Sequence, residues 1–338
     1  MRTVQAAVKH CCLSLLVSQG RIVIAGSLLL NRRAHAHCES IVDQAAELRV
    51  ETSQVASARI IDLGITVPGG LEAGRRMAQV SMAALGEVTF ATSPLTGGPA
   101  VLVRTDNPVA ACMASQYAGW EVKGDGYFAM GSGPMRAAAG REELFEHIGC
   151  RETADVAVGL LETDTVPPEA VCADLAAKCG VETSALTLLV APTNSQAGNV
   201  QVVARSVETA LHKLHELGFD LARVESGWGL APLPPVAGDV LSGIGRTNDA
   251  ILYGGHVVLY VRGDQESIDQ LGPKAPSSAS ADHGRPFKEL FAAYDHDFYK
   301  IDKHLFSPAV VELVNLDTGA NRRYGKFAPE VLEKSFGT

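Results

Sequence analysis

Several features that assign a chain to a familiar class are missing from this sequence. Its seven cysteines are odd in number and form no Cys-x-x-Cys pair, which favours reduced thiols in a cytosol over a disulfide framework. No apolar run reaches the roughly 18 residues that a membrane span needs. Lys and Arg number 29 against 38 Asp and Glu, which disfavours a nucleic-acid binder that relies on phosphate contacts. We therefore expect a cytoplasmic protein with neither a membrane nor a nucleic acid as partner.

Familiar catalytic signatures are also missing. The sequence contains neither a phosphate-binding G-x-x-x-x-G-K-[ST] loop nor the G-x-S-x-G of many acyl-transfer enzymes. The segment "GDGYFA" (124–129) formally fits a dinucleotide fingerprint, but it follows "WEVK", which is a poor buried strand. "HAHC" (35–38) offers donor atoms without partner ligands at a known spacing. We expect no metal site.

Acidic residues are absent from the first 36 positions, which hold five basic residues and several short apolar runs. A transit-like presequence remains one interpretation. We favour the simpler one, in which residues 1–30 form an N-terminal extension outside the folded protein.

The remaining pattern indicates an α+β (mixed α/β) fold, because helical and strand periodicities alternate irregularly. Strands are expected over 58–65, 87–92, 100–105, 154–163 and 185–192, helices over 69–86, 167–180 and 286–298, and a terminal hairpin over 310–327. A second hairpin is expected around Gly254 and Gly255. A chain of 338 residues accommodates about two domains. We place them at residues 31–180 and 181–338.

The segment "VARSVETALHKLHELGFD" (203–220) predicts one helix that ends at Gly218. Its apolar stripe runs through Val203, Val207 and Leu211 toward the core. Arg205 and Glu208 fall on another side, one turn apart. Local pattern alone favours a surface ion pair, worth only a few tenths of a kcal/mol.

Several polar stretches are rich in glycine. Taken alone, each of them is typical of a turn. They are "GSGPMR" (131–136), "APTNSQAGN" (191–199) and "GIGRTNDAILYGG" (243–255). Together they supply backbone N–H groups, amides and the side chains of Arg136 and Arg246. That set suits a polyfunctional anionic or heterocyclic ligand without identifying it.

Taken in order, these motifs resemble methenyltetrahydromethanopterin cyclohydrolase over roughly residues 31–338. The resemblance rests on "GGLEAGR", "SQYAGW", "FAMGSGPMR", "APTNSQAGNVQVVARSVETALHKLHELGFD", "GRTNDAILYGG", "ADHGRPF" and "FYKIDKHLFSPA". It implies a cofactor-free cytoplasmic homotrimer of two α+β domains side by side, with a substrate pocket between them. The implied reaction interconverts 5,10-methenyltetrahydromethanopterin plus water and 5-formyltetrahydromethanopterin.

The family's catalytic Arg and Glu map onto Arg205 and Glu208. The methenyl carbon is an electrophile that shares positive charge with N5 and N10. Glu208 would hold a water against this carbon and take its proton. Arg205 would fix the Glu208 carboxylate by hydrogen bonds and lower its pKa. Enclosure of the carboxylate in a dry pocket would raise that pKa and so balance the effect of Arg205.

Substrate-binding roles are hypotheses for the polar stretches. Arg136 would meet an anionic tail of the pterin substrate, and Asp249 would face the amide-and-amine edge of its ring. Further candidates are Asn194, Ser195, Gln196, Arg246 and Asn248. Two alternatives stay open: a non-catalytic pterin-binding protein of the same fold, and a cyclohydrolase that acts on a folate.

Overall fold

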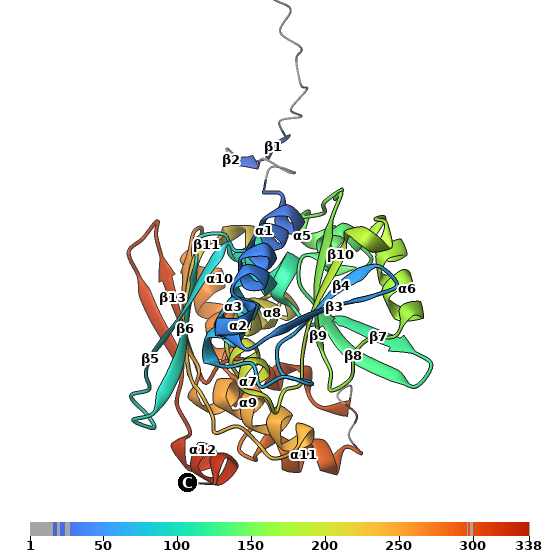
Figure 1. Ribbon diagram of the computed structural model, residues 1–338. Coiled ribbons are helices and arrows are strands. Elements are labelled where there is room, and N and C mark those ends of the chain that lie inside the picture. The colour runs from blue at the N-terminus through green and yellow to red at the C-terminus, as the bar shows by residue number, and fades with distance from the viewer. Residues whose placement is uncertain (1–15, 19–20, 24–27, 296, 298–299, 338) are drawn as a thin grey trace, which may run out of the picture.

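Two β-sheets enclose a central layer of helices in the computed structural model of this chain (Figure 1). The structure describes residues 16–18, 21–23, 28–295, 297 and 300–337. Helices α1 (Leu30–Asp43), α3 (Leu71–Ser81), α7 (Gln196–Val203) and α8 (Ser206–Glu216) lie between the sheets. This arrangement confirms the predicted mixture of helices and sheets.

The first sheet has six strands. Their order is β3 (Glu51–Val55), β4 (Ala58–Asp62), β10 (Leu186–Ala191), β9 (Ala157–Glu162), β8 (Tyr127–Ser132) and β7 (Trp120–Gly124). Strands β4, β10 and β9 run parallel, and the other pairs are antiparallel. All six residues of β10 are buried, as expected for a central strand covered on both faces.

The second sheet also has six strands, and only its pair β12–β13 is parallel. The order is β14 (Asn321–Gly325), β13 (Val310–Asn315), β12 (His256–Val261), β11 (Val224–Pro232), β6 (Pro99–Thr105) and β5 (Gly86–Thr92). The predicted terminal hairpin is confirmed by the antiparallel pairing of β13 with β14.

The predicted hairpin around Gly254 and Gly255 is wrong, because helix α9 (Val240–Gly254) occupies residues that were expected to form turns and a strand. Asp239 caps this helix by accepting a hydrogen bond from the backbone N–H of Ser242 at 2.8 Å. Its glycines allow close packing: a Cβ at Gly243 would lie 3.0 Å from the backbone nitrogen of Asn194. The glycines here serve helix packing rather than a turn.

Each sheet takes strands from both sides of residue 180. Strands β5 and β6 lie in the second sheet, and β10 completes the first. Strand pairing does not test independent folding, so the domains at residues 31–180 and 181–338 stay a prediction. The short strands β1 (Leu16–Ser18) and β2 (Arg21–Val23) form a two-stranded sheet of their own.

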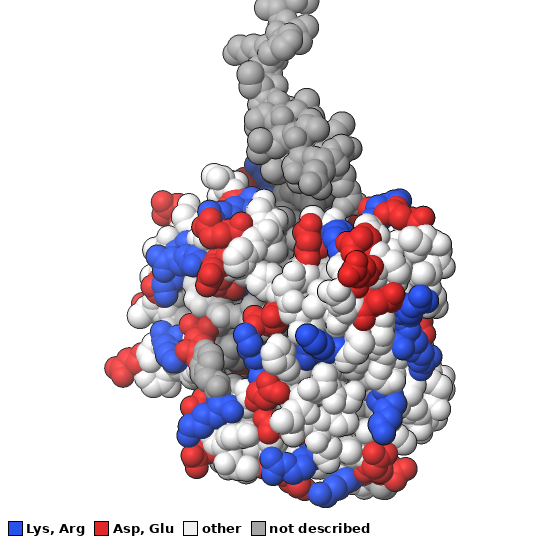
Figure 2. All heavy atoms as spheres, turned by 180° about the vertical axis from the view of Figure 1, so that it is seen from behind, with Lys and Arg blue, Asp and Glu red and all other residues white. Residues whose placement is uncertain are grey.

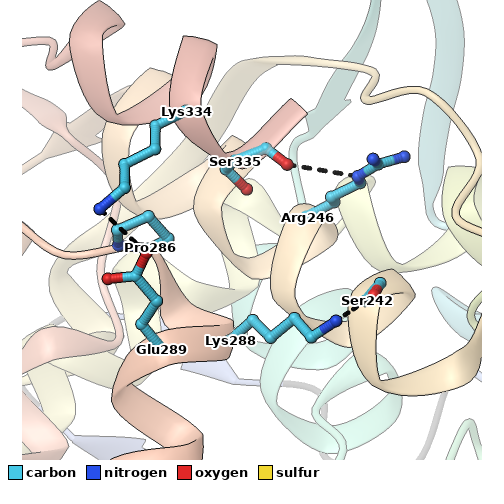
Figure 3. A pocket seen from close by; sticks show the side chains of 7 residues that line it. All are labelled: Ser242, Arg246, Pro286, Lys288, Glu289, Lys334 and Ser335. Atoms are coloured by element: carbon cyan, nitrogen blue, oxygen red, sulfur yellow. Dashed lines mark hydrogen bonds and ion pairs between the residues drawn. The ribbon is translucent and has the colours of Figure 1, made fainter. Parts of the chain in front are cut away.

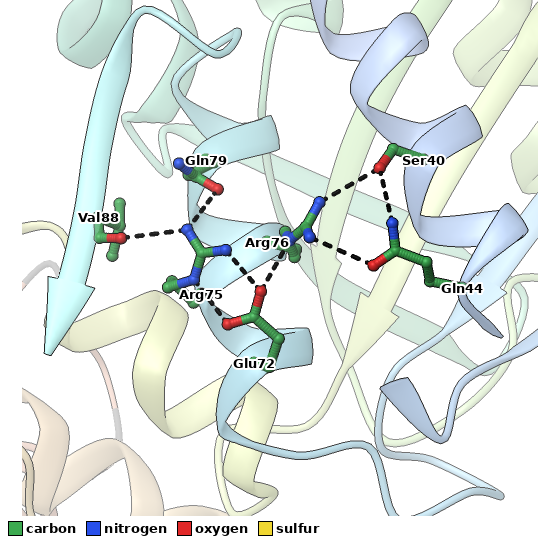
Figure 4. A network of polar contacts seen from close by, with 7 residues as sticks. All are labelled: Ser40, Gln44, Glu72, Arg75, Arg76, Gln79 and Val88. Carbon is green, nitrogen blue, oxygen red and sulfur yellow. Dashed lines mark hydrogen bonds and ion pairs between the residues drawn. The ribbon is translucent and has the colours of Figure 1, made fainter. Parts of the chain in front are cut away.

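Helix α3 connects several elements of the central layer. Arg75 and Arg76 both bind Glu72, and Arg76 also donates hydrogen bonds to Ser40 in α1 and to Gln44 just after it (Figure 4). On another side of α3, a Cβ at Gly74 would approach the Cα atom of Ala197 in α7 to 2.8 Å. Glycine is therefore required for the α3–α7 contact.

The π-helix η1 (Val109–Gln116) is buried and packs on α8 and α3. The other α-helices are α2 (Ala45–Leu48), α4 (Met135–Ala139), α5 (Leu144–Ile148), α6 (Glu169–Cys179), α10 (Gln265–Leu271), α11 (Phe287–Ala293) and α12 (Pro329–Phe336). None of the helices in the described part of the chain is long and apolar enough to cross a membrane. On the rear face, basic and acidic side chains are interspersed (Figure 2).

Candidate active site

A break between two helices positions the predicted catalytic pair. The helix expected over residues 203–220 is divided into α7, which ends at Val203, and α8, which begins at Ser206. Arg205 is the N-cap of α8, with φ −88° and ψ 10°. Its side chain therefore leaves the chain at a helix junction, while Glu208 lies in the first turn of α8. The predicted end at Gly218 is confirmed by the left-handed backbone there, with φ 79°.

The guanidinium of Arg205 is buried, and its partners are Gln201, four residues earlier, and three residues of distant segments. Nη2 donates to the Gln201 amide oxygen at 2.9 Å and to Ser132 Oγ at 3.1 Å, and it lies 3.1 Å from the Glu162 carboxylate. Nη1 donates to the backbone oxygen of Gln116. Only 5% of Arg205 is exposed, so the surface ion pair favoured by local pattern is wrong.

Glu208 is buried as well, with 6% of the residue exposed. Burial raises the pKa of its carboxyl to about 7, with Glu162 adding to this effect, while Arg205 and Arg136 act in the opposite direction. No hydrogen bond or ion pair joins the carboxylate to another residue within the described ranges. A buried carboxyl that titrates near neutrality is suited to accept a proton and to return it.

Arg136, the predicted contact for an anionic tail, lies fully buried in α4. Its Nε donates to Glu142 at 2.9 Å, and Nη1 donates to the backbone oxygen of Met113 at 2.8 Å. The guanidinium carbon lies 4.9 Å from the ring centroid of Tyr117. These contacts occupy Arg136 inside the protein, where its charge acts on Glu208. Its contact with a substrate tail stays a prediction.

Asn194, Ser195 and Gln196 follow β10 at the carboxyl end of the parallel strands. Ser195 caps α7, accepting a hydrogen bond from the N–H of Gly198 at 3.0 Å. Asn194 is partly exposed, and the exposed Gln196 accepts a 3.4 Å hydrogen bond from Arg49. Ligands commonly bind at such strand ends in open sheets, which supports these three residues as candidates. Their contact with substrate stays a prediction.

The three candidates on α9 have different surroundings. Asp249 is fully buried and accepts hydrogen bonds from the N–H of Phe287 at 2.8 Å and from Ser335 Oγ at 2.6 Å. Burial raises the pKa of Asp249 to about 7. Asn248 donates to the backbone oxygen of Ile244 at 2.9 Å. The contacts of Asp249 and Asn248 are internal to the fold, and their binding of substrate stays a prediction.

Arg246 lines an open hollow of about 210 Å³ between α9, α11 and α12 (Figure 3). The other lining residues are Ser242, Pro286, Lys288, Glu289, Lys334 and Ser335. Lys334 pairs with Glu289 at 2.9 Å, and Lys288 donates to Ser242 Oγ at 2.7 Å. Arg246 itself donates to backbone oxygens, including that of Ser335 at 3.3 Å. These contacts do not connect Arg246 with Glu208.

Sequence reasoning missed four residues that surround Arg205: Gln116, Ser132, Glu162 and Gln201. All but Glu162 lie within the glycine-rich stretches or motifs quoted above, and Glu162 ends β9, so the carboxyl end of a strand was the available signal. Arg205 and two of its partners carry buried polar atoms without a hydrogen-bond partner in the described structure: Arg205 Nε, Gln116 Oε1 and Gln201 Nε2. Unpaired buried donors and acceptors are costly and are characteristic of functional sites.

Comparison with known proteins identifies the family. Residues 29–336 match the family described as Cyclohydrolase (MCH). The chain belongs to this family. It is 48% identical over 315 residues to a methenyltetrahydromethanopterin cyclohydrolase of Rhodopirellula baltica, covering 91% of this chain and 95% of the relative. A protein of the same name from Methylobacillus flagellatus is 47% identical, with the same shares covered. One from Methanocaldococcus jannaschii is 40% identical, covering 92% and 98%.

Proposed function

We propose that this member of the family interconverts 5,10-methenyltetrahydromethanopterin plus water and 5-formyltetrahydromethanopterin, a reaction of one-carbon metabolism. The observation that supports it most is the buried Glu208 carboxyl, whose pKa of about 7 lies where a general base is effective. The substrate is that of the methenyltetrahydromethanopterin cyclohydrolases to which the chain is similar. The reaction proceeds on residues of this chain without a cofactor.

Hydration begins with a water held between Glu208 and the methenyl carbon. A C–O bond forms while Glu208 takes a proton from the water, and the positive charge shared by N5 and N10 is discharged. Protonated Glu208 then returns a proton to N10. The bond from carbon to N10 breaks as the C=O bond forms, and the hydroxyl proton leaves. The formyl group stays on N5, and one proton is released overall.

Arg205 stabilises the ionised form of Glu208, because a nearby cation favours a carboxylate. Its four contacts to protein oxygens fix the guanidinium in place before substrate binds. Preorganised charge of this kind needs no rearrangement during the reaction. The substrate contacts proposed above for Arg136, Asn194–Gln196, Arg246, Asn248 and Asp249, the homotrimer and the cytoplasmic location remain predictions.

The decisive experiment compares Glu208→Gln with wild type by following loss of the methenyl absorbance. We expect kcat to fall at least about a hundredfold, the typical contribution of a positioned acid–base group, with substrate binding retained. Glu216→Gln is a matched control, because Glu216 lies at the end of the same helix and pairs with Lys303 at the surface. Full turnover in Glu208→Gln contradicts the assigned base.

The same assay separates the alternative functions. A pterin-binding protein without catalytic activity binds the methenyl substrate but leaves its hydration rate unchanged. A folate enzyme hydrates 5,10-methenyltetrahydrofolate with a larger kcat/KM than the methanopterin substrate. We expect the reverse preference.

A further inference from the structure

The nearest carboxylate partner of Arg205 is Glu162 at the carboxyl end of β9, not Glu208. Arg205 Nη2 lies 3.1 Å from Glu162 Oε1. Glu208 takes part in no ion pair among residues that the structure describes. Two carboxylates therefore share the surroundings of one guanidinium, and only one of them contacts it.

Two further contacts hold the Arg205 guanidinium toward Glu162. The same Nη2 atom donates to the Gln201 amide oxygen at 2.9 Å, and Gln201 is fully buried. Nη2 also donates to Ser132 Oγ at 3.1 Å on β8, the strand next to β9. Gln201 and Ser132 accept the two hydrogen bonds of this nitrogen, and Glu162 lies beside it as its ion-pair partner.

We propose that Glu162 is a positioning residue, which holds the Arg205 guanidinium on β9 and so prevents it from closing onto the Glu208 carboxylate. This inference rests on the proposed function, in which Glu208 is the base. A direct ion pair would make Glu208 a weak base and would block the oxygen that has to hold water. With Glu162 in place, Arg205 acts on Glu208 as a nearby cation only.

The charges around Glu208 agree with this role. Glu162 raises the pKa of Glu208, whereas Arg205 and Arg136 lower it. Arg136 is itself held by Glu142. Tyr117 and Cys112 of the η1 region have raised pKa values, about 12 for Tyr117, and His212, one turn farther along α8, has a pKa lowered to about 4. All three are neutral at physiological pH. Glu162 is thus the one carboxylate among these groups that opposes both arginines at Glu208.

The test is the pH dependence of kcat in Glu162→Gln. The amide keeps an acceptor for Arg205 but loses the negative charge, so the guanidinium is free to stabilise ionised Glu208. We expect the acid limb of the profile to move to lower pH by about one unit. On the alkaline plateau kcat falls about threefold, because a weaker base takes a proton more slowly. Glu87→Gln is the control, since Glu87 pairs with Arg104 on the exposed sheet edge.

A charge-relocation variant tests the same idea from the other side. Gln201→Glu places a second carboxylate against Arg205 Nη2. The acid limb of the kcat profile is expected to move to higher pH by about one pH unit. In the double variant Glu162→Gln/Gln201→Glu the limb returns toward the wild-type position. A residue needed only for folding shows neither opposed shifts nor this rescue. If Glu162→Gln does not fold, the shift of the acid limb in Gln201→Glu alone tests the role of Glu162.

An acid limb that stays at the wild-type pH in both single variants overturns the role of Glu162. That outcome is distinct from failure of the proposed function, which is seen in wild type alone. If wild type does not accelerate hydration, or if Glu208→Gln keeps full activity, the assigned base is wrong before Glu162 is considered.

Discussion

The rings of Tyr117 and His212 stack with 4.7 Å between their centroids and an angle of 19° between their planes. This contact joins the end of the η1 region to α8, one turn beyond Glu208. Burial lowers the pKa of His212 to about 4, so the imidazole is neutral at physiological pH. His212 is therefore a packing residue beside the site, and the titration expected near neutrality belongs to Glu208.

The first prediction concerns the pH profile of wild type. Because the base form of Glu208 is required, kcat is expected to be half-maximal near pH 7 and to fall about tenfold per unit well below that pH. His212→Phe preserves a ring for stacking and removes the imidazole. The acid limb of this variant should coincide with that of wild type. A displaced or missing limb in His212→Phe would assign the titration to the histidine instead.

A second prediction concerns Asp249 and stability. Its folded-state pKa of about 7 lies above the ordinary value of 3.8, so the folded state binds the proton more tightly. The resulting stabilisation is fully present below pH 3.8 and is lost as pH rises to about 7. Asp249→Asn has no carboxyl to ionise, so it does not show this loss. The Tm of the variant, relative to that of wild type, is therefore expected to rise between pH 4 and 7. Parallel Tm curves would contradict the assigned ionisation.

Kinetics of the same variant test the sequence-based role of Asp249. If its carboxylate only joins α9 to Phe287 and Ser335, KM of Asp249→Asn stays close to wild type. Ser335→Ala removes one of these hydrogen bonds and is expected to cost about 1 kcal/mol of unfolding free energy. A large rise in KM without a change in Tm would restore Asp249 as a substrate contact.

The third prediction addresses the contact between α3 and α7. In Gly74→Ala the new methyl group would meet Ala197 and Val200 at 2.8 Å, so the two helices must separate. We expect a loss of about 1–3 kcal/mol, typical of an overpacked core. Gly238→Ala is the matched control, because nothing lies within 4 Å of its added Cβ. Denaturant unfolding measures both, and equal midpoints would contradict the packing argument.

The fourth prediction locates the start of the folded protein. Asn31 is fully buried, and its side chain donates to Pro134 O at 2.9 Å and accepts from Val158 N at 2.9 Å. Asn31→Ala leaves these groups unpaired and is expected to cost about 1–3 kcal/mol. Removal of residues 1–27 should leave Tm and kcat unchanged. A marked loss of Tm in the shortened protein would contradict the expected extension.

Local pattern predicted β4, β5, β6, β9, β10 and the terminal hairpin, and helices α3, α6 and α8, because these depend on apolar spacing along a short segment. It gave no expectation for β3, β7, β8 or β11. It predicted the burial of Val203, Val207 and Leu211, all of which are fully buried. It failed at Arg205, since a helix break and partners more than 40 residues away decide where that side chain goes. The family resemblance, not the helical pattern, pointed to Arg205 and Glu208.

Glu162 and α9 show two further limits of sequence reasoning. In the strand 157–162 the position of Glu162 at the carboxyl end is the one available signal. It does not reveal the role of Glu162, because its partner Arg205 lies on another element. In α9, glycines that suggest turns are used instead for close contacts with Asn194 and Lys288. A glycine permits both, and only the neighbouring elements decide between them.

The way in which the strands are shared between the two sheets has a consequence for synthesis on the ribosome. Strand β6 emerges early, but its neighbour β11 begins only at Val224. Strand β4 likewise waits for β10, which begins at Leu186. A nascent chain of this protein therefore exposes unfinished strand edges until well over half of it has been translated. Such edges pair readily with other chains, so slow elongation or truncation after β6 favours aggregation over productive folding.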